Sequence, residues 1–153
     1  MKTFSDGQRG VVRLTPTQTT IADIAKLGGP RPIPRRRRTA FQRQTWEVPA
    51  QLTNYRFDAG GLRLVLFDDE SYLNAVIPVP TCLLRSARAR AAMQAAWKRM
   101  LGCAHPARGW QSFGVIAHIS GVGFWSQRRA SRGSAPNGAE LYPVTGVRIV
   151  VGC

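Results

Sequence analysis

Arginines are the residues whose number and spacing in this chain point most directly to chemistry. Four of them are consecutive, Arg35, Arg36, Arg37 and Arg38, and they follow the proline-rich segment 30–34. A proline-rich segment is extended and stiff. A basic run beyond such a spacer is typical of an arm that contacts the phosphates of a polyanion. A solvated linker is the alternative interpretation of the same run.

A second group of arginines lies in a polar loop near the C-terminus, residues 126–138. The arginines of this loop that we expect to contact phosphate are Arg128, Arg129 and Arg132. Arg63 and Tyr72 lie on alternating segments upstream, and Trp125 directly precedes the loop. Cations mixed with aromatic rings can follow a nucleic-acid backbone and stack on its bases. For Trp125, burial in the core is the alternative.

The charge balance agrees with a polyanionic partner. The 153 residues include 22 Lys and Arg against 8 Asp and Glu, a formal net charge of +14. The first 45 residues hold ten basic and two acidic side chains. A protein this basic attracts nucleic acid or an anionic membrane. Arginines that simply occupy solvated faces are the alternative explanation.

Hydropathy argues against a membrane partner. No segment reaches the roughly eighteen apolar residues of a membrane-spanning helix, and the first residues lack the apolar stretch of a signal peptide. We therefore expect a cytoplasmic protein that binds single-stranded or structured RNA or DNA. A structural subunit of a ribonucleoprotein or other assembly is an alternative that the sequence does not separate from this one.

Acidic residues and histidines make a weaker case for catalysis. The candidates for a metal-dependent phosphodiester hydrolase, which is the second alternative, are Asp58, Asp68, Asp69, His118 and Glu140. Two of them lie in one short turn that solvation explains, and no pair of nucleophile and base emerges. Gly121 and Gly123 are not followed by the helix of a dinucleotide-binding unit. We expect no catalytic residue, no metal and no cofactor.

The three cysteines, Cys82, Cys103 and Cys153, lack the spacing of a zinc site. A helix between Cys82 and Cys103 would separate them by more than about 20 Å, beyond the roughly 7 Å that a disulfide spans. The sequence therefore predicts reduced cysteines.

Five segments alternate with the period of a β-strand. They begin near Trp46, Leu62, Tyr72, Phe113 and Leu141. Between the third and fourth, the Ala-rich stretch from Ser86 to Leu101 has a helical apolar stripe. Five strands with a helix in that place is the connectivity of the OB-fold, a small Greek-key barrel that binds oligonucleotides on its second and third strands and two adjoining loops. We expect a mostly β, OB-fold-like domain over residues 45–153 that binds nucleic acid without catalysis.

Residues 1–44 are expected to form a basic N-terminal arm ahead of this domain. Thr20 and Asp23 have the spacing of a capping box, so a short helix should begin there. The glycines and proline at 28–30 should end it. An isolated helix of about two turns is marginal in water, so it either docks on the domain or is disordered.

Two C-terminal motifs resemble a family of small, largely uncharacterised bacterial proteins. Residues 120–126 read S-G-V-G-F-W-S and residues 135–144 read A-P-N-G-A-E-L-Y-P-V. The family pattern is T-G-V-G-F-F-D, a His-Gly-Gln turn, then A-P-N-G-I-E-L-H-P-V. The likeness extends to K-T-F-S-D at 2–6, T-I-A-D at 20–23 and I-P-V-P-T-C at 77–82, so it covers most of the chain.

The chain departs from that family at its polar positions. Ser126 replaces the Asp, Tyr142 replaces the second His, and the loop 128–132 replaces the His-Gly-Gln turn. In segment 58–66 the His of the family's D-x-D-x-H-L-V-L strand is replaced by an apolar or basic residue. If those groups bind metal or transfer protons in the family, the resemblance implies a divergent member that has lost most of them.

Overall fold

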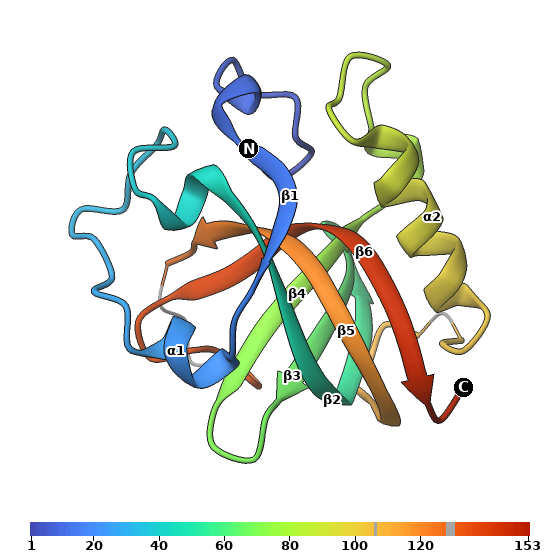
Figure 1. The fold of residues 1–153 in the computed structure, drawn as a ribbon. Coiled ribbons are helices and arrows are strands. Elements are labelled where there is room, and N and C mark those ends of the chain that lie inside the picture. Colours follow the sequence, from blue (N-terminus) through green and yellow to red (C-terminus); the bar gives the residue numbers. More distant parts are fainter. Residues whose placement is uncertain (106, 128–130) are drawn as a thin grey trace.

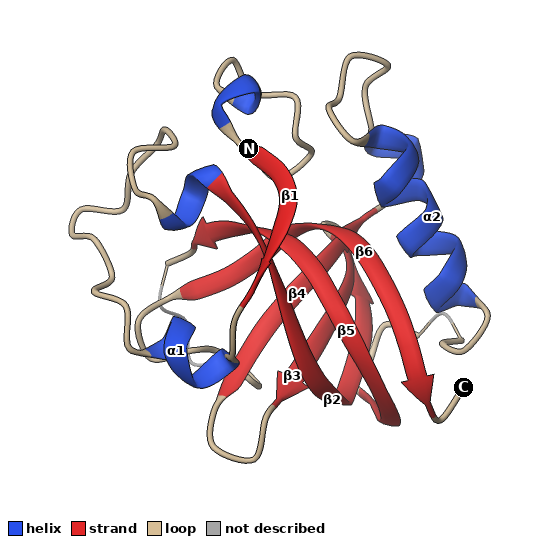
Figure 2. Ribbon diagram, in the orientation of Figure 1, coloured by secondary structure: helices blue, strands red, loops and turns tan. Residues whose placement is uncertain are grey.

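The computed structural model describes residues 1–105, 107–127 and 131–153, and this part of the chain is mostly β-structure (Figures 1 and 2). Its strands are β1 (Arg13–Gln18), β2 (Gln44–Asp58), β3 (Gly61–Phe67), β4 (Tyr72–Pro78), β5 (Gln111–Trp125) and β6 (Ala139–Val151). Its α-helices are α1 (Ile21–Ala25) and α2 (Arg90–Leu101). Short 3-10 helices occur at Arg9–Val11, Phe41–Arg43 and Pro80–Cys82.

Five of the strands close a ring of hydrogen-bonded pairs. β2 pairs with β3, and β3 with β4, in antiparallel fashion. β4 pairs with β6 in parallel, β6 with β5 antiparallel, and β5 returns to β2 antiparallel. β2 and β5 are each 15 residues long, so β2 can pair with β5 and β3 at once. The five expected strands are confirmed, with α2 between the third and fourth.

Alternate residues of the ring strands form the core, as their sequence period predicts. Leu62, Leu64 and Leu66 of β3 are fully buried and belong to one apolar cluster with side chains of every other ring strand. A Cβ at Gly123 would collide with the backbone of Phe41. The glycine therefore permits a close approach of the chain late in β5.

Strand β1 was not expected from the sequence. It pairs in parallel with the first residues of β2, from Arg13 opposite Gln44 to Gln18 opposite Glu47. All six of its residues are exposed. A strand with no buried face shows no apolar alternation, and Pro16 within it is compatible only with an edge position. That is why the sequence pattern placed these residues in an irregular arm.

The short helix α1 forms and docks on the ring. The Thr20 hydroxyl accepts a hydrogen bond from the backbone N–H of Asp23 at 3.0 Å, as the capping pattern predicts. Ile21 and Ile24 are buried in the main core cluster, whereas Leu27, just beyond the helix, is 39% exposed. Burial of the two isoleucines stabilises a helix too short to persist alone.

The longer helix begins later than its sequence predicted, at Arg90 instead of Ser86. Ala89 has a positive φ of 54°, so the chain turns sharply there before the helix starts. The helix buries Met93, Ala96 and Met100, and the ring of Trp97 meets Phe57 edge-on at 5.5 Å. Figure 1 shows α2 beside the C-terminal strand β6, at one side of the ring.

The N-terminal residues pack on the body of the protein instead of extending from it. Phe4 and Val12 are buried in a second apolar cluster together with Met93 of α2. Arg88 donates to the backbone carbonyls of Arg9 and Val12 at 2.5 and 2.7 Å. Residues 4–12 therefore belong to the folded unit.

The expectation that all three cysteines are reduced is wrong for two of them. Cys103 and Cys153 form a disulfide, with their Cα atoms 5.4 Å apart, and Cys82 is free and exposed. The helical spacing in the α2 region excluded only a disulfide between Cys82 and Cys103. The end of β6 meets the loop after α2 through tertiary packing, which local spacing does not report. No helix among the described residues is long and apolar enough to cross a membrane.

Candidate nucleic-acid interface

A cavity of about 510 Å³ opens on the outer surface of the ring, between the β2–β3 turn and the β5–β6 loop. Among its lining residues are Asp58 of β2, Arg63 of β3, Glu140 of β6, and Ser126 and Ser134 of the β5–β6 loop. Successive side chains of a strand point to opposite faces. Because the leucines on either side of Arg63 fill the core, Arg63 points outward to the cavity. We call this feature the outer cavity.

Arg63 is held in place by two carboxylates. Its Nε donates to Asp58 Oδ2 and its Nη1 to Glu140 Oε1, each at 3.2 Å. The side chains of Arg63 and Glu140 are 17% and 10% exposed. Asp58 is fixed in turn by the backbone N–H of Gly60, which donates to its Oδ1 at 2.8 Å. The β2–β3 hairpin and the distant strand β6 thus place one guanidinium and two carboxylates in contact.

Two further arginines gather around an aromatic ring beside this group. The guanidinium of Arg56, which also lines the outer cavity, lies 4.7 Å from the ring centre of Trp110. The guanidinium of Arg132, from the β5–β6 loop, lies 5.9 Å from the same ring. Cation–π contacts of this kind hold both the cation and the ring in position. The result is a cationic and aromatic edge that a nucleic-acid strand can follow.

Lys2 lies on another side of the outer cavity, above two aromatic rings. Its Nζ is 5.7 Å from the ring centre of Phe124 and 5.5 Å from that of Tyr142. The Tyr142 hydroxyl donates to the carbonyl of Gly60 at 3.0 Å. Burial, and then the negative charge of Asp58, raise the pKa of Tyr142 to about 12. The phenol is therefore a neutral donor at physiological pH, and it ties β6 to the β2–β3 turn.

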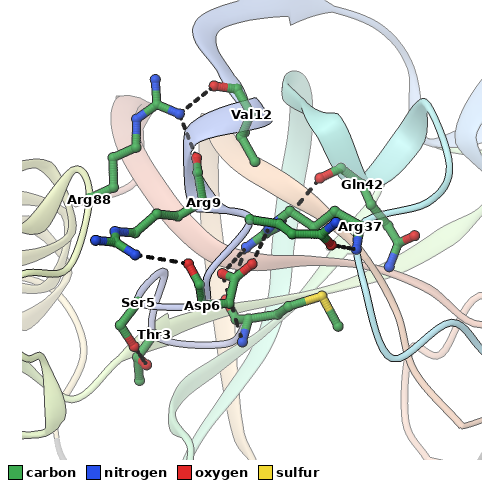
Figure 3. Close-up of polar contacts among 10 residues, drawn as sticks. Thr3, Ser5, Asp6, Arg9, Val12, Arg37, Gln42 and Arg88 are labelled. Carbon is green, nitrogen blue, oxygen red and sulfur yellow. Dashed lines mark hydrogen bonds and ion pairs between the residues drawn. The ribbon is translucent and has the colours of Figure 1, made fainter.

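A buried ion pair fixes the N-terminal residues beside the outer cavity (Figure 3). Arg37, which is fully buried, donates from Nε and Nη2 to the two oxygens of Asp6 at 3.0 and 2.9 Å. It also donates to the carbonyls of Gln42 and Met1 at 3.2 and 3.3 Å. Burial raises the pKa of Asp6, but the hydrogen bonds and charge of Arg37 outweigh it and hold that pKa below its usual value. Met1 and Lys2 are thereby tied to the body.

The expected arm of four arginines divides into two kinds. Arg35, Arg36 and Arg38 are exposed, as an arm that contacts phosphate requires. Arg37 is not available for such contact, because every donor group of its guanidinium is turned toward Asp6, Gln42 and Met1. A run of identical residues does not reveal which member has a buried counter-ion, so this assignment needed the tertiary structure.

Of the residues expected to stack on bases, one is buried and one is exposed. Trp125 is 3% exposed, and its Nε1 donates to the hydroxyl of Thr39 at 2.9 Å, so it is a core residue and not a free platform. Tyr72 is 47% exposed and stacks on Phe67 at 4.6 Å. Arg132 is exposed and borders the outer cavity's rim at Trp110. The expected contacts at Arg128 and Arg129 lie outside the described residues.

The candidate catalytic acids do not converge as a set. Asp58 and Glu140 meet, but they share Arg63 as their partner. Asp68 instead accepts the backbone N–H of Ala22 at 2.9 Å, and Asp69 is exposed on its turn. His118 lies with Glu47, its Nδ1 3.5 Å from a carboxylate oxygen. Across residues 1–105, 107–127 and 131–153, no group of three or more His, Cys, Asp or Glu could hold a metal ion.

Several residues of the outer cavity were missed by sequence reasoning. Lys2 is adjacent to the cavity only because residues 1–12 fold back onto the ring, which no local pattern indicates. Arg56 and Phe124 could have been found from the sequence, since each occupies an outward-facing position of an alternating strand. Trp110 precedes β5 and shows no periodicity, so nothing in the sequence distinguished it from a loop residue.

Neither a protein-family model nor a curated protein sequence matches this chain. Among solved structures, the fold is similar to part of a putative aspartyl-tRNA synthetase from Leishmania major Friedlin, with a TM-score of 0.54 and 11% identity over 93% of this chain and 22% of that one. It is also similar to part of the Entamoeba histolytica asparaginyl-tRNA synthetase in complex with asparaginyl-adenylate, with a TM-score of 0.51 and 13% identity over 91% of this chain. The chain spans about a quarter or less of each neighbour, 25% of the second. At these identities the likeness concerns the fold.

Proposed function

We propose that this chain is an OB-fold protein that binds single-stranded or structured nucleic acid without catalysis. The observation that carries the proposal is the position of the outer cavity, between the β2–β3 turn and the β5–β6 loop. These are the first–second and fourth–fifth strand loops of the five-stranded ring, and OB-folds bind oligonucleotides and oligosaccharides there. Since the chain is strongly basic, we favour the oligonucleotide.

Charge attraction supplies the part of the proposed binding affinity that does not depend on the base sequence of the nucleic acid. The net charge of +14 draws the protein to polyanions. The exposed side chains of Arg35, Arg36 and Arg38 are available to pair with phosphates, and so is Arg132, which is exposed beside the Trp110 ring. Each phosphate neutralised releases a counterion, so the affinity should fall steeply with salt.

Accessible aromatic rings can stack on the bases of the nucleic acid, whichever base is present. Tyr72 presents nearly half of its surface on β4, and the half-buried Trp110 contacts both Arg56 of the cavity lining and Arg132. A base stacked on an aromatic ring contributes about 1–3 kcal/mol. Trp125 also lines the outer cavity, but at 3% exposure it has no free face on which a base could stack.

Two further observations bear on the family and on the ligand of this cavity. Two positions where the chain departs from the bacterial family it resembles lie here, because Ser126 lines the cavity and Tyr142 adjoins it. We propose on this ground that the chain is a divergent member of that family. In addition, both structural neighbours carry the names of aminoacyl-tRNA synthetases, which agrees with RNA as the ligand.

A salt titration of binding tests the proposal. Fluorescence anisotropy would compare single-stranded RNA, single-stranded DNA and a duplex with the full chain and with Arg35→Ala/Arg36→Ala/Arg38→Ala. Removing three phosphate contacts should make the decrease of log K with log salt concentration less steep, reducing the magnitude of the slope by about 2. The matched control is Arg85→Ala/Lys98→Ala/Arg99→Ala, three exposed cations on and before α2, which should leave the slope nearly unchanged.

The full chain is the right starting material for this test. A deletion of residues 1–44 would remove Phe4, Ile21 and Ile24 from the core, so its failure to bind would report unfolding. If the full chain binds none of the three nucleic acids at low salt, the proposed function is wrong. If the two triple variants have equal slopes, the arginine run does not contact the nucleic acid.

A further inference from the structure

The outer cavity contains two carboxylates, which a simple phosphate site would exclude. Glu140 is 8% exposed. Its Oε1 accepts a hydrogen bond from Arg63, and its Oε2 accepts none from the residues that the structure describes. An ionised carboxylate can only accept hydrogen bonds. Because Oε2 is not one of the buried side-chain atoms that lack a partner, it is open to the cavity that Glu140 lines, where a donor group of a ligand can replace water.

Nucleobases differ in whether they can supply that donor. Cytosine, adenine and guanine each carry an exocyclic amino group, whereas uracil and thymine carry a carbonyl oxygen in its place. In cytosine and adenine the amino group adjoins a ring nitrogen that accepts hydrogen bonds. The cavity offers the complementary order, with the acceptor Glu140 beside the donor Arg63. Uracil would instead place its O4 lone pairs against the carboxylate.

We propose that the outer cavity takes one unstacked base that carries an exocyclic amino group, and that Glu140 discriminates against uracil and thymine. This inference rests on the proposed function and names the specificity of the same site. The cavity volume of about 510 Å³ is within the range of sites that enclose a small organic ligand. Phe124 supplies an apolar wall, while Lys2 and Arg56 supply positive charge at the lining for the attached phosphates.

Cytidine and uridine oligonucleotides provide the sharpest comparison. The two pyrimidines have the same size and backbone, and they differ at the amino or carbonyl group and at the neighbouring ring nitrogen. We would measure anisotropy with labelled single strands of about twelve nucleotides, a length that an OB-fold site accommodates. The cytidine strand should bind about tenfold more tightly than the uridine strand, the discrimination of one good base contact.

The variant Glu140→Gln separates base recognition from simple charge. Its amide oxygen can still accept from Arg63, and its NH₂ can donate to O4 of uracil. The preference for cytidine should therefore disappear or reverse, because an amide that keeps its oxygen on Arg63 turns its NH₂ toward the base. If Glu140 acts only by repelling phosphate, both affinities would rise together and the preference would remain. The matched control is Asp69→Asn, an exposed acid with φ of 70°, a conformation that Asn accepts.

The outcomes distinguish this inference from the proposed function. Equal binding of both strands by the unaltered protein would overturn the cavity's specificity and leave nucleic-acid binding standing. No binding of either strand at low salt would overturn both. If Glu140→Gln does not fold, as circular dichroism would show, the preference of the unaltered protein alone decides the proposal.

Discussion

Replacing Asp6 with Asn should destabilise the protein by roughly 3 kcal/mol, because it leaves the buried guanidinium of Arg37 without its counter-ion. Arg37 has no exposed surface, and its Nη2 lies 2.9 Å from Asp6 Oδ1. Removing one partner of a buried pair costs about 3–5 kcal/mol. The Asp6 side chain is 16% exposed, so water can reach part of the site and we expect the lower end. The melting temperature should fall by roughly 6–12 °C.

The pH dependence of stability should identify Asp6 as the titrating group. Because the folded-state pKa of Asp6 lies below its ordinary value of 3.8, the unfolded chain takes up a proton first as the pH falls. The contribution of the pair is therefore complete well above pH 3.8 and is lost as the pH falls through the folded pKa. The stability difference between the protein and Asp6→Asn should shrink over that acidic range.

Urea unfolding followed by circular dichroism measures these differences. The control is Asp23→Asn, since Asp23 pairs with Lys26 at 3.8 Å and both side chains are more than half exposed. A pair of that kind contributes at most about 1 kcal/mol. Adding Arg37→Met to Asp6→Asn should recover stability, because the unpaired charge is removed. A cost no larger than that of the Asp23 control would refute the role assigned to the buried pair.

Three further predictions concern the core, the disulfide and a buried phenol. Trp125→Ala should cost about 3–5 kcal/mol in urea unfolding, whereas Tyr72→Ala should leave stability within about 1 kcal/mol and weaken oligonucleotide binding; the reverse order would contradict the exposures of the two rings. Reduction of the Cys103–Cys153 disulfide, which closes a loop of 50 residues, should lower stability by about 2–4 kcal/mol; Cys82→Ser is the control. An ultraviolet titration should show a tyrosine with a pKa of about 12 that Tyr142→Phe removes. Since that pKa is raised, stability should fall as the pH rises above the ordinary tyrosine value of 10.0, and no such change in the variant is expected.

Elements with a buried face could be predicted from the sequence. The five ring strands alternate because one face of each packs on the core, and the acidic and glycine-containing turns at 58–61 and 68–71 join them into hairpins. The start of α1 was predicted because a cap is a local hydrogen bond, here from Asp23 to Thr20. The helix α2 was found but its start was misplaced, since the turn at Ala89 depends on packing and not on composition.

The candidate site was only partly predictable. Arg63, Tyr72 and the arginines of the β5–β6 loop could be proposed because an OB-fold assigns its binding face to particular strands and loops. The core position of Trp125 and the buried partner of Arg37 could not, because aromatic rings and guanidinium groups serve equally well on a surface or in an interior. Their environment depends on residues far away in the sequence.

The sequence by itself therefore determined the order of the ring strands and helix and the excess of positive charge. Both can be read from the local periodicity and the composition of the sequence. The periodicity arises because one face of each element packs on the core while the other faces water. Only the tertiary structure decided that β1 joins the sheet, that Cys103 meets Cys153, and that Glu140 meets Arg63 from 77 residues away. Such contacts arise when the core brings distant segments together, and no short-range pattern records which partners will meet.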